Sequence, residues 1–350
     1  MRAGLKVVVV SSYPPRHCGV GAYAAGQVAE LRAAGHDVRV ISPPDGHGDE
    51  RVRAFGGRPF LRAVRRSRSA DRVVVHFQPG LWYRPRRPVS KVLTSLGLLW
   101  LTMRRPSTEL VVHEANRPRW GGLRPDDLLL GLALRRARLL FHTDTERRQL
   151  EREFHLRVRR HTLVEHTVHL GGREPVRRSE ARAVLAIPEH ITLFVSPGFL
   201  HPDKGFERAV EAFGRLTSSP APVPGHLEPS DRRLVVVGSV RDRTMENLAY
   251  VGRLRDLCER TPGVTFLDSY LDDEDFDRWI AAADRLVLPY RRSWSSGVLA
   301  RARAIGTPVI VAATGGLPEQ TGPEDRVFET DEELARLLHD AAGDRAGAAP

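Results

Sequence analysis

Cysteine and lysine are scarce in this chain. Only Cys18 and Cys258 carry thiols among 350 residues, which excludes a disulfide framework and a cysteine-rich zinc cluster. Lysine occurs three times, as Lys6, Lys91 and Lys204, so that arginine supplies 51 of the 54 basic side chains. A coding bias toward GC-rich codons explains this preference for arginine.

The chain also lacks a long hydrophobic run. Its longest apolar stretch, residues 92–103, contains Thr94, Ser95 and Gly97 and is shorter than the ~20 residues that a spanning helix needs. The first residues lead directly into the strand-like run Lys6–Ser12, without the pattern of a signal peptide. We therefore expect a soluble protein of the cytoplasm.

Acidic side chains are scarce only in the first half. Residues 1–168 hold 31 Lys and Arg against 15 Asp and Glu, a charge of +16, whereas residues 169–350 hold 23 against 28, a charge of −5. Codon bias does not explain this difference between the halves. It indicates a basic face that meets a phosphorylated substrate, an anionic lipid surface or nucleic acid. Nucleic acid is disfavoured because no recognised binding motif accompanies the charge.

Short β-branched runs alternate with helical patterns along the chain, which is typical of βαβ units around a parallel sheet. In the first half, strands are expected at residues 6–12, 37–42, 72–77, 110–113 and 138–143, and helices at 21–34, 89–103, 126–136 and 144–154. In the second half, strands are expected at residues 191–195, 233–238, 264–267, 285–289 and 308–312, and helices at 206–216, 245–260, 274–283, 297–305 and 331–340.

The predicted fold class is therefore α/β, with two Rossmann-like doubly wound domains facing a ligand cleft. Residues 1–168 form the N-terminal domain and residues 169–190 a linker, in which glycines and a proline interrupt the alternation. Residues 191–343 form the C-terminal domain, and residues 344–350 are expected to be a frayed tail.

Two glycines follow the first predicted strand. Gly19, Gly21 and Ala24 match the spacing G-x-G-x-x-A, but six residues separate Gly19 from the strand and no acidic residue closes the second strand. Both departures argue against a dinucleotide site. The glycines can instead let the backbone approach an anion at the start of a helix, or simply form a tight turn.

Two loops of the second domain follow strands and precede helices, at the sheet edge where α/β proteins bind ligands. The first, Gly198–Gly205, contains Lys204, a compact cation that suits a narrow diphosphate pocket. The second, Trp294–Val298, contains Ser295 and Ser296, which can cap the following helix and leave its first N–H groups facing an anion. A solvated surface lysine and an ordinary helix cap are the alternatives.

These features resemble, in order and spacing, the family 4 retaining glycosyltransferases, over roughly residues 6–320. The matching pieces are Gly19 and Gly21, His113 within Val111–Glu114, Glu165–Thr167, Gly198 with Lys204 and Gly205, Val237–Ser239, Leu288–Tyr290, Ser296–Gly297, Gly306–Val309 and Gly315–Glu319. The resemblance implies the GT-B fold, with the acceptor on the N-terminal domain and a nucleotide-diphosphate sugar on the C-terminal domain.

The resemblance also implies roles for individual residues. His113 and Lys204 would be catalytic, with His113 lining the reaction centre and Lys204 neutralising the diphosphate. The donor phosphates would be bound by Gly19, Gly21, Lys204 and the main chain of Ser295, Ser296, Gly297 and Val298. The nucleotide or sugar site would be lined by Gly198, Gly238, Ser293 and Arg301. No metal and no further cofactor is implied, because the lysine and the helix dipole carry the electrostatic role. His142, His166, His169 and His201 remain alternatives to His113.

Two departures from the family stand out. The positions of its usual pair of glutamates, which contact the donor sugar and the ribose, hold Ser293 and Arg301, and Phe199 replaces a common arginine. Arginine cannot accept hydrogen bonds from ribose hydroxyls. The sequence Trp294–Gly297 instead resembles a branch of the family with a W-S-S-G motif. We expect a hexosyltransferase that uses a UDP- or GDP-linked sugar, or alternatively a weakened nucleotide-sugar-binding subunit of a glycan-assembly complex.

Two charged clusters complete the sequence predictions. The acidic run Asp272–Asp275 precedes a predicted helix, where carboxylates favour the positive end of the dipole, so we interpret it as a helix start rather than a metal site. Basic residues flank the apolar segment 89–103, which holds Trp100: Arg62, Arg65, Arg66, Arg68, Arg84, Arg86 and Arg87. This pattern predicts peripheral attachment to the anionic inner face of the cell membrane and a glycan or lipid-linked acceptor. An ordinary core helix beside a solvated basic face is the alternative.

Overall fold

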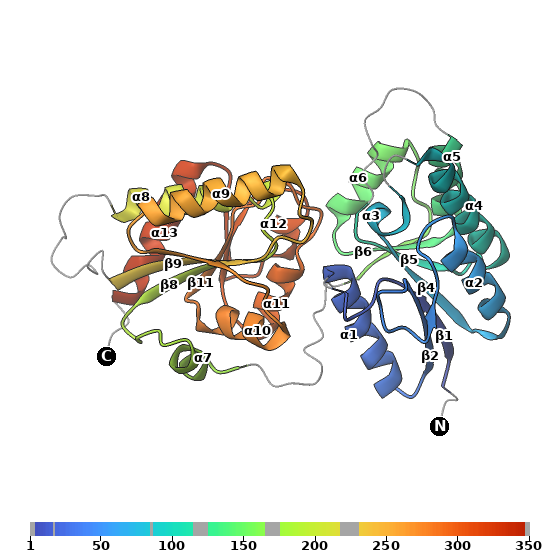
Figure 1. Cartoon of the computed structure of the whole chain (residues 1–350), viewed down its shortest axis with the longest axis horizontal. Coiled ribbons are helices and arrows are strands. Elements are labelled where there is room, and N and C mark those ends of the chain that lie inside the picture. The colour runs from blue at the N-terminus through green and yellow to red at the C-terminus, as the bar shows by residue number, and fades with distance from the viewer. Residues whose placement is uncertain are drawn as a thin grey trace. The chain divides into compact units, whose positions relative to one another are not determined.

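The computed structural model describes residues 4–16, 18–84, 87–114, 125–164, 176–217 and 231–346. Of these, residues 216, 217 and 342–346 are described by their backbone only. The predicted motif pieces at residues 165–167, together with His166, His169 and Arg86, lie outside these ranges. The chain divides into two units, Met1–Gly172 and Arg173–Pro350, which we call the N-unit and the C-unit. Figure 1 shows that each unit has its own sheet with helices packed around it.

The N-unit contains a parallel sheet with the strand order β3-β2-β1-β4-β5-β6-β7. Its strands are β1 Lys6–Val10, β2 Asp37–Ser42, β3 Glu50–Arg51, β4 Arg72–Phe77, β5 Glu109–Val112, β6 Arg138–Phe141 and β7 His161–Leu163. Its helices are α1 Gly19–Ala33, α2 Arg58–Arg66, the 3₁₀ turn η1 Ser67–Ser69, α3 Pro79–Trp82, α4 Pro88–Arg104, α5 Pro125–Arg136 and α6 Asp144–Phe154. The strand order reverses beside β1, whose neighbours are β2 and β4.

The C-unit repeats this architecture with the strand order β10-β9-β8-β11-β12-β13. Its strands are β8 Thr192–Pro197, β9 Arg232–Gly238, β10 Val264–Asp268, β11 Arg285–Leu288, β12 Val309–Ala312 and β13 Arg326–Phe328. Its helices are α7 Arg178–Val184, the 3₁₀ turn η2 Pro202–Lys204, α8 Phe206–Thr217, α9 Met245–Arg260, α10 Asp273–Ala282, α11 Gly297–Ile305, α12 Leu317–Gln320 and α13 Asp331–Ala346. Every strand pair described in the two sheets is parallel, so the predicted fold class of two doubly wound α/β domains is confirmed.

Apolar residues cover both faces of the C-unit sheet, which explains its continuous apolar strands. In β8, Phe194 contributes to a cluster with Phe206 and Phe213 of α8, whereas its neighbours Leu193 and Val195 contribute to a second cluster, which includes Ile280. Successive side chains of a strand point to opposite faces. The sheet is therefore buried between two layers of helices, and its strand ends form the edges where polar chemistry can lie.

The predicted helix ends match the structure where capping chemistry marks them. Thr143 and Glu146 form a reciprocal capping box at the start of α6, and Gly306 ends α11 with a left-handed φ of 87°. The expected frayed tail from residue 344 is wrong for its first residues, because α13 continues to Ala346. Alanine, abundant at this end, favours the helical backbone.

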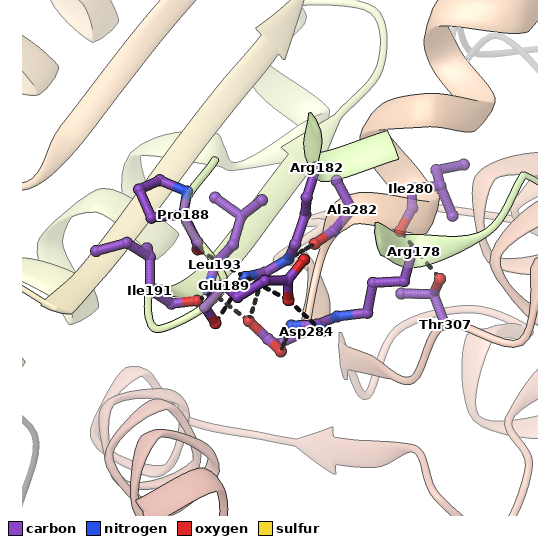
Figure 2. A network of polar contacts seen from close by, with 10 residues as sticks. All are labelled: Arg178, Arg182, Pro188, Glu189, Ile191, Leu193, Ile280, Ala282, Asp284 and Thr307. Carbon is purple, nitrogen blue, oxygen red and sulfur yellow. Dashed lines mark hydrogen bonds and ion pairs between the residues drawn. The ribbon is translucent and has the colours of Figure 1, made fainter. Parts of the chain in front are cut away.

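A buried arginine holds α7 against the C-unit sheet (Figure 2). Arg182 is fully buried and its Nη2 donates to Asp284 Oδ2 at 2.7 Å, while Arg178 binds Oδ1 of the same carboxylate at 2.6 Å. Leu193 N at the start of β8 also donates to Asp284 Oδ2. The remaining N–H groups of Arg182 donate to the carbonyls of Pro188, Glu189, Ile191 and Ala282. A buried guanidinium satisfied in this way carries its charge without an unpaired donor.

Candidate functional site

The predicted site residues lie at the carboxyl ends of the two sheets, and each edge is described by itself. In both units the strand order reverses there, beside β1 and beside β8. Loops diverge on either side of such a reversal, and ligands of open α/β sheets bind at this point.

At the N-unit edge, Gly19 and Gly21 lie in the first turn of α1, not in a preceding loop. Neither glycine has a positive φ, so the prediction that helix α1 begins at residue 21 and the alternative of a glycine-dependent tight turn are both wrong. Gly19 is exposed, with open space where a side chain would extend, whereas a Cβ on Gly21 would lie 3.3 Å from Ser12 Oγ. Gly21 thus allows α1 to pack closely against the end of β1, and Gly19 leaves its N-terminus accessible.

Three histidines meet at the ends of adjacent strands of the N-unit. His113 follows β5, His142 follows β6, and His76 is the penultimate residue of β4. His76 and His113 stack with ring centroids 5.3 Å apart, and His113 and His142 are 5.7 Å apart. Tyr23 of α1 contacts all three rings edge-on, at centroid distances of 5.3 to 5.6 Å. The edge thus presents a compact aromatic and imidazole cluster.

His76 connects this cluster to α1. Its Nδ1 is 3.0 Å from His113 Nε2, and its Nε2 is 3.2 Å from Gln27 Oε1. Burial lowers the pKa of His76 to about 3, so the ring is neutral at physiological pH. Burial also raises the pKa of Tyr23 to about 12, which keeps its phenol protonated. His113 is half-buried and lies at the outer end of the chain Gln27–His76–His113.

At the C-unit edge, close backbone contacts shape the loop after β8. Gly198 has φ 139°, and a Cβ on Gly238 would lie 1.7 Å from the Gly198 carbonyl oxygen. Gly205 has φ 59°, and a Cβ there would lie 2.4 Å from the Pro289 carbonyl oxygen. Glycine at positions 198, 205 and 238 therefore lets the ends of three neighbouring strands approach one another.

Lys204 lies on the aromatic ring of Tyr290. Its Nζ is 3.6 Å from the ring centroid, and the ring itself is fully buried. The N–H groups of Arg291 and Arg292 donate to the Asp203 carbonyl, at 2.8 and 3.2 Å. A cation over an aromatic face is attracted by the ring quadrupole. These contacts place the ammonium beside the segment that leads from β11 into α11.

Ser296 caps α11, as predicted. Its Oγ accepts from Leu299 N at 3.2 Å and its N–H donates to Gln320 Oε1 at 2.8 Å. The N–H groups of Gly297 and Val298 belong to the first turn, where a helix supplies no backbone acceptor. Val298 also lies close to the other loop, since a Cβ on Gly198 would be 4.0 Å from Val298 Cγ2. Lys204 and the N-terminus of α11 therefore belong to one edge of one sheet.

Ser293 and Arg301 differ in their surroundings. Ser293 Oγ donates to the Ser295 carbonyl at 2.9 Å, within the loop itself. Arg301 points toward α10, where it pairs with Asp273 and Asp277 and stacks over Phe276. Its guanidinium is therefore bound by carboxylates of its own unit, which argues against the predicted contact with nucleotide or sugar.

The acidic run before α10 caps the helix, as the sequence indicated. Asp272 Oδ1 accepts from Glu274 N and Asp275 N. Among the described residues, no group of three His, Cys, Asp or Glu side chains is arranged to hold a metal ion. Within the same residues, no helix combines the length and the apolar character that a bilayer crossing requires.

Sequence reasoning missed His76, Gln27 and Tyr290. His76 lies inside the apolar run Arg72–Phe77, and a histidine in a strand buried on both faces is itself a signal. Gln27 follows the glycines by two turns of α1, and nothing in the sequence connects it to β4. Tyr290 ends the motif piece Leu288–Tyr290, from which the sequence predicted no role for its side chain. A hollow of about 520 Å³ beside the Lys204 loop, lined in part by Asp203, Glu207 and Tyr250, was also unforeseen.

Comparisons with known proteins find similar sequences and similar structures. Residues 189–344 match the family Glycosyl transferases group 1. A D-inositol 3-phosphate glycosyltransferase of Nocardioides sp. is 30% identical over 188 residues, which is 51% of this chain and 39% of that protein. The corresponding enzyme of Mycobacterium tuberculosis is 31% identical over 183 residues, 52% of this chain and 35% of that protein. The chain thus aligns with less than half the length of these relatives.

Solved structures show similarity over nearly the whole chain. Sucrose-phosphate synthase from Thermosynechococcus elongatus aligns with a TM-score of 0.70 and 19% identity, covering 98% of this chain and 92% of that chain. HepE of Anabaena, in complex with UDP-glucose, aligns with a TM-score of 0.69 and 15% identity, covering 97% and 90%. The fold is therefore that of the GT-B glycosyltransferases, with two parallel-sheet Rossmann-like domains.

Proposed function

We propose that this chain is a retaining glycosyltransferase that transfers a hexose from a UDP- or GDP-linked donor to a hydroxyl of a glycan or lipid-linked acceptor, without a metal. The C-unit would bind the donor and the N-unit the acceptor. The matches to glycosyltransferases support the reaction class. HepE binds UDP-glucose, which supports a nucleotide-sugar donor.

One observation carries the proposal: Lys204 and the N-terminus of α11 lie at the same edge of the C-unit sheet, and the loop of Tyr290 joins them. A diphosphate leaving group develops negative charge as the bond to the sugar breaks. A fixed ammonium and the N–H groups of Gly297 and Val298 are suited to stabilise that charge. They would do the electrostatic work that a divalent cation does in other transferases.

His113 would contact the transferring sugar from the N-unit edge. It follows β5 and belongs to the imidazole cluster, and an imidazole can polarise hydroxyls or exchange a proton with them. Gly19, at the accessible start of α1, would bring backbone N–H groups to a phosphate or to the acceptor. The Trp294–Gly297 turn would replace the donor contacts of the family's glutamates.

The second candidate is a nucleotide-sugar-binding subunit of a glycan-assembly complex with weakened catalysis. The observation in its favour is that Ser293 bonds within its own loop and Arg301 pairs with α10. Neither position presents a carboxylate to a ribose or a sugar. Binding would then depend on Lys204 and the α11 N-terminus alone.

Sugar release from labelled UDP- and GDP-sugars separates the two candidates. We expect turnover with one nucleotide series and a loss of at least about 100-fold in Lys204→Ala, the size typical for one electrostatic contact. Lys6→Ala, at an exposed lysine where β1 begins, is the matched control. If calorimetry detects nucleotide binding but no sugar is released, only the candidate function of a binding subunit remains. If neither nucleotide binding nor sugar release is detected, both candidate functions are overturned.

We also propose that the N-unit docks on an anionic membrane surface through α4 and α5. Five apolar side chains spaced four and three residues apart form a stripe on α4, each 43 to 72% exposed: Val89, Leu93, Leu96, Trp100 and Met103. Leu128 and Leu132 extend it onto α5, which packs against α4. A single exposed apolar residue needs no explanation, but a contiguous patch of this kind indicates a binding surface.

Basic residues border this apolar stripe, and their charge favours a lipid surface over another protein. Arg84 and Arg87 precede α4, Arg104 stacks over Trp100, and Arg135 and Arg136 end α5; all five are exposed. An apolar stripe with a basic border matches the layering of acyl chains beneath anionic headgroups. Such docking would bring a lipid-linked acceptor to the N-unit and place the enzyme at the inner face of the membrane.

Sedimentation with vesicles tests the docking. We expect binding to vesicles containing phosphatidylglycerol but not to phosphatidylcholine alone, and loss of binding in the double variant Leu93→Gln, Trp100→Gln. Met245→Gln, at a fully separate exposed apolar residue of the C-unit, is the control. Unchanged vesicle binding by the double variant would show that the protein does not dock through the apolar stripe of α4. A concentration-dependent doubling of mass that the double variant abolishes would assign the surface to a second copy instead.

A further inference from the structure

The two acidic side chains nearest to Lys204 along the chain are directed elsewhere. Asp203 Oδ2 lies 3.7 Å from His201 Nδ1, and Glu207 accepts a hydrogen bond from Arg291 Nε at 2.9 Å. Within the part of the chain that the structure describes, Lys204 forms no ion pair with a carboxylate. Its charge is therefore not neutralised by these neighbours.

The ammonium of Lys204 lies instead on the ring of Tyr290. Nζ is 3.6 Å from the ring centroid, well inside the ~6 Å within which the ring quadrupole attracts a cation. The ring is fully buried and belongs to an apolar cluster that includes Leu299 of α11 and Leu317 of α12. Because a closely packed ring cannot follow the lysine, the ring determines where the ammonium rests.

An aromatic ring and a carboxylate would hold this lysine with different consequences for an anionic ligand. A carboxylate would neutralise the ammonium and repel an approaching phosphate. An aromatic face carries no net charge and attracts the ammonium from one side only. The N–H donors of Nζ that point away from the ring therefore stay available to a ligand.

The segment that carries the ring also leads into the second half of the proposed donor site. Tyr290 lies between β11 and the N-terminus of α11. Val298, in the first turn of α11, packs against the same apolar cluster as the Tyr290 ring. The Arg291 N–H donates to the Asp203 carbonyl at 2.8 Å, which joins this segment to the loop of Lys204. The ring thus lies where the two halves of the donor site meet.

We propose that Tyr290 is a positioning residue, whose buried ring holds the ammonium of Lys204 in place of a carboxylate and directs it at the diphosphate of a nucleotide-sugar donor. The inference rests on the proposed transferase function for the identity of the ligand, whereas the contact with the ring is a property of the protein without ligand. Lys204, and not Tyr290, would touch the leaving phosphate. Tyr290 acts through it.

The ring also explains why this position holds a lysine. Arginine supplies 51 of the 54 basic side chains, so codon bias alone would favour arginine here as elsewhere. A guanidinium on an aromatic face stacks flat, which directs its N–H groups along the ring rather than away from it. A compact ammonium at 3.6 Å from the centroid directs its donors outward. The position therefore requires an ammonium and not only a positive charge.

NMR of the full chain, with carbon-13 at Cε of lysine, detects the contact without any ligand. The chain has three lysines and should give three signals. We expect the ring current to shift the Hε protons of one of them upfield, and this signal to vanish in Lys204→Ala. The upfield shift should persist in Tyr290→Phe and disappear in Tyr290→Leu. Three unshifted signals in the wild-type protein would overturn the proposal.

Calorimetric titration with UDP and with GDP supplies the second readout. We expect Tyr290→Leu to weaken the binding of the preferred nucleotide about tenfold, the order that a desolvated cation–π contact accounts for. Tyr290→Phe, which keeps the aromatic face, should change the affinity less than about twofold. Lys204→Arg, which keeps the charge, should weaken binding about tenfold as well.

Phe328→Leu is the matched control for the loss of a buried ring. The Phe328 ring is fully buried in the same unit and lies under the guanidinium of Arg208, which already pairs with Asp331. This substitution should lower stability as Tyr290→Leu does but leave nucleotide affinity unchanged. Thermal unfolding of every variant measures the loss of packing that the two leucine substitutions share.

A double-mutant cycle distinguishes positioning from general packing. If Tyr290 acts through Lys204, Tyr290→Leu should have little effect on nucleotide affinity in the Lys204→Ala background, where no ammonium is left to position. A loss of the same size in both backgrounds would show that the ring supports the site independently, and this would overturn the proposal. Wild-type affinity in Lys204→Arg would show that charge alone suffices, with the same consequence.

The outcomes separate the role of Tyr290 from the proposed function. Coupled losses of nucleotide affinity, in a protein that releases no sugar from any donor, support the role of Tyr290 and overturn the transferase. Sugar release by a protein whose lysine signals lack the upfield shift, or whose cycle is additive, supports the transferase and overturns the role of Tyr290. A wild-type protein that binds neither UDP nor GDP overturns the assigned ligand even where the upfield shift is present.

Discussion

Two cations of the C-unit show how the surroundings of a side chain determine its use. Lys204 lies over the Tyr290 ring, which attracts its charge without neutralising it. Arg301 meets two carboxylates of α10, and these hydrogen bonds raise its pKa although its burial opposes the charge. A cation on an aromatic face remains able to bind an anionic ligand, whereas the guanidinium of Arg301 is already neutralised by Asp277 and Asp273.

The substitution Arg301→Met is therefore expected to affect stability rather than ligand binding. It leaves the Asp277 carboxylate, which is itself buried, without its guanidinium partner. We expect a loss of about 3 kcal/mol in the free energy of unfolding of the C-unit, as for a broken buried pair. Nucleotide affinity should change less than twofold. Denaturant unfolding and calorimetric titration measure the two effects, and a tenfold weaker nucleotide affinity at equal stability would contradict this assignment.

His76 predicts a pH dependence of stability whose sign follows from its lowered pKa. Burial lowers this pKa from 6.5 to about 3, so between these values the unfolded chain binds a proton that the native chain does not. Stability therefore falls as the pH decreases below 6.5, by up to about 1.4 kcal/mol per pH unit. At pH 7 and above the contribution is constant.

His76→Asn, which has no titrating group at this position, should lack this component of the slope. Unfolding of the N-unit measured at pH 7.0, 6.0 and 5.0 in both proteins checks the prediction, since all other titrating groups are shared. Parallel slopes in the two proteins would show that His76 titrates alike in the folded and unfolded chains.

At the scale of elements, the end of β9 can reach its neighbour only because residue 238 has no side chain. A Cβ on Gly238 would overlap the Gly198 carbonyl oxygen at 1.7 Å. Since Gly198 begins the loop that holds Lys204, any separation of the two strand ends would displace the proposed donor site. The backbone contact therefore links strand pairing to ligand binding.

Gly238→Ala is expected to destabilise the C-unit by several kcal/mol and to abolish nucleotide binding. Gly252→Ala, within α9 where a Cβ meets nothing within 4 Å, is the matched control. Because alanine favours the helix, this control should stabilise the protein by about 0.5–1 kcal/mol. Thermal unfolding of both variants, with nucleotide titration, separates the effects. A Gly238→Ala protein as stable as the wild type would show that β9 can shift.

The elements that could be predicted from the sequence are those with a local signature. Runs such as Val7–Val10 are apolar throughout because helices cover both faces, and residues such as Thr143 and Gly306 mark helix ends. Short elements at the margins lack such signals: β3 has two residues, and four of the nine residues of α2 are arginines. They form because neighbouring elements supply their partners.

The same distinction, between residues with a local sequence signature and residues without one, applies to the candidate site. Lys204 and Ser296 could be predicted because each follows a strand and precedes a helix, a position readable along the chain. The contact between His76 and Gln27 joins residues 49 positions apart and depends on how α1 packs against β4. The orientation of Arg301 likewise depends on α10, so its position in the sequence suggested a ligand contact that its ion pairs argue against.

At the scale of the whole molecule, the charge difference between the halves acquires a structural basis. The exposed arginines of the N-unit include those that border the α4 and α5 stripe. Other arginines pair with acids in both units, such as Arg62 and Arg66 with Glu50 and Arg255 with Asp268. Clustered surface charge acts over about a Debye length, so its effect on an anionic surface depends on ionic strength.

Reversing two of these charges should weaken vesicle binding. For Arg135→Glu with Arg136→Glu we expect a loss of about 1 kcal/mol for each basic residue removed, and a smaller salt dependence between 50 and 500 mM NaCl. A matched charge reversal on the C-unit, Arg215→Glu with Arg241→Glu, should change neither. Equal losses from both pairs would assign the effect to net charge alone.

The buried Arg182 limits where the chain can be truncated or cleaved without destabilising the C-unit. Its guanidinium, with that of Arg178, neutralises Asp284 and also binds the carbonyl of Ile191, just before β8. A truncation at Ile191, just before β8, would remove both of the guanidinium groups that bind the Asp284 carboxylate. A fragment that includes α7 retains them. The smallest autonomous piece of the C-terminal half therefore starts upstream of Arg178, and a protease that cleaves between Arg182 and β8 would release an unstable product.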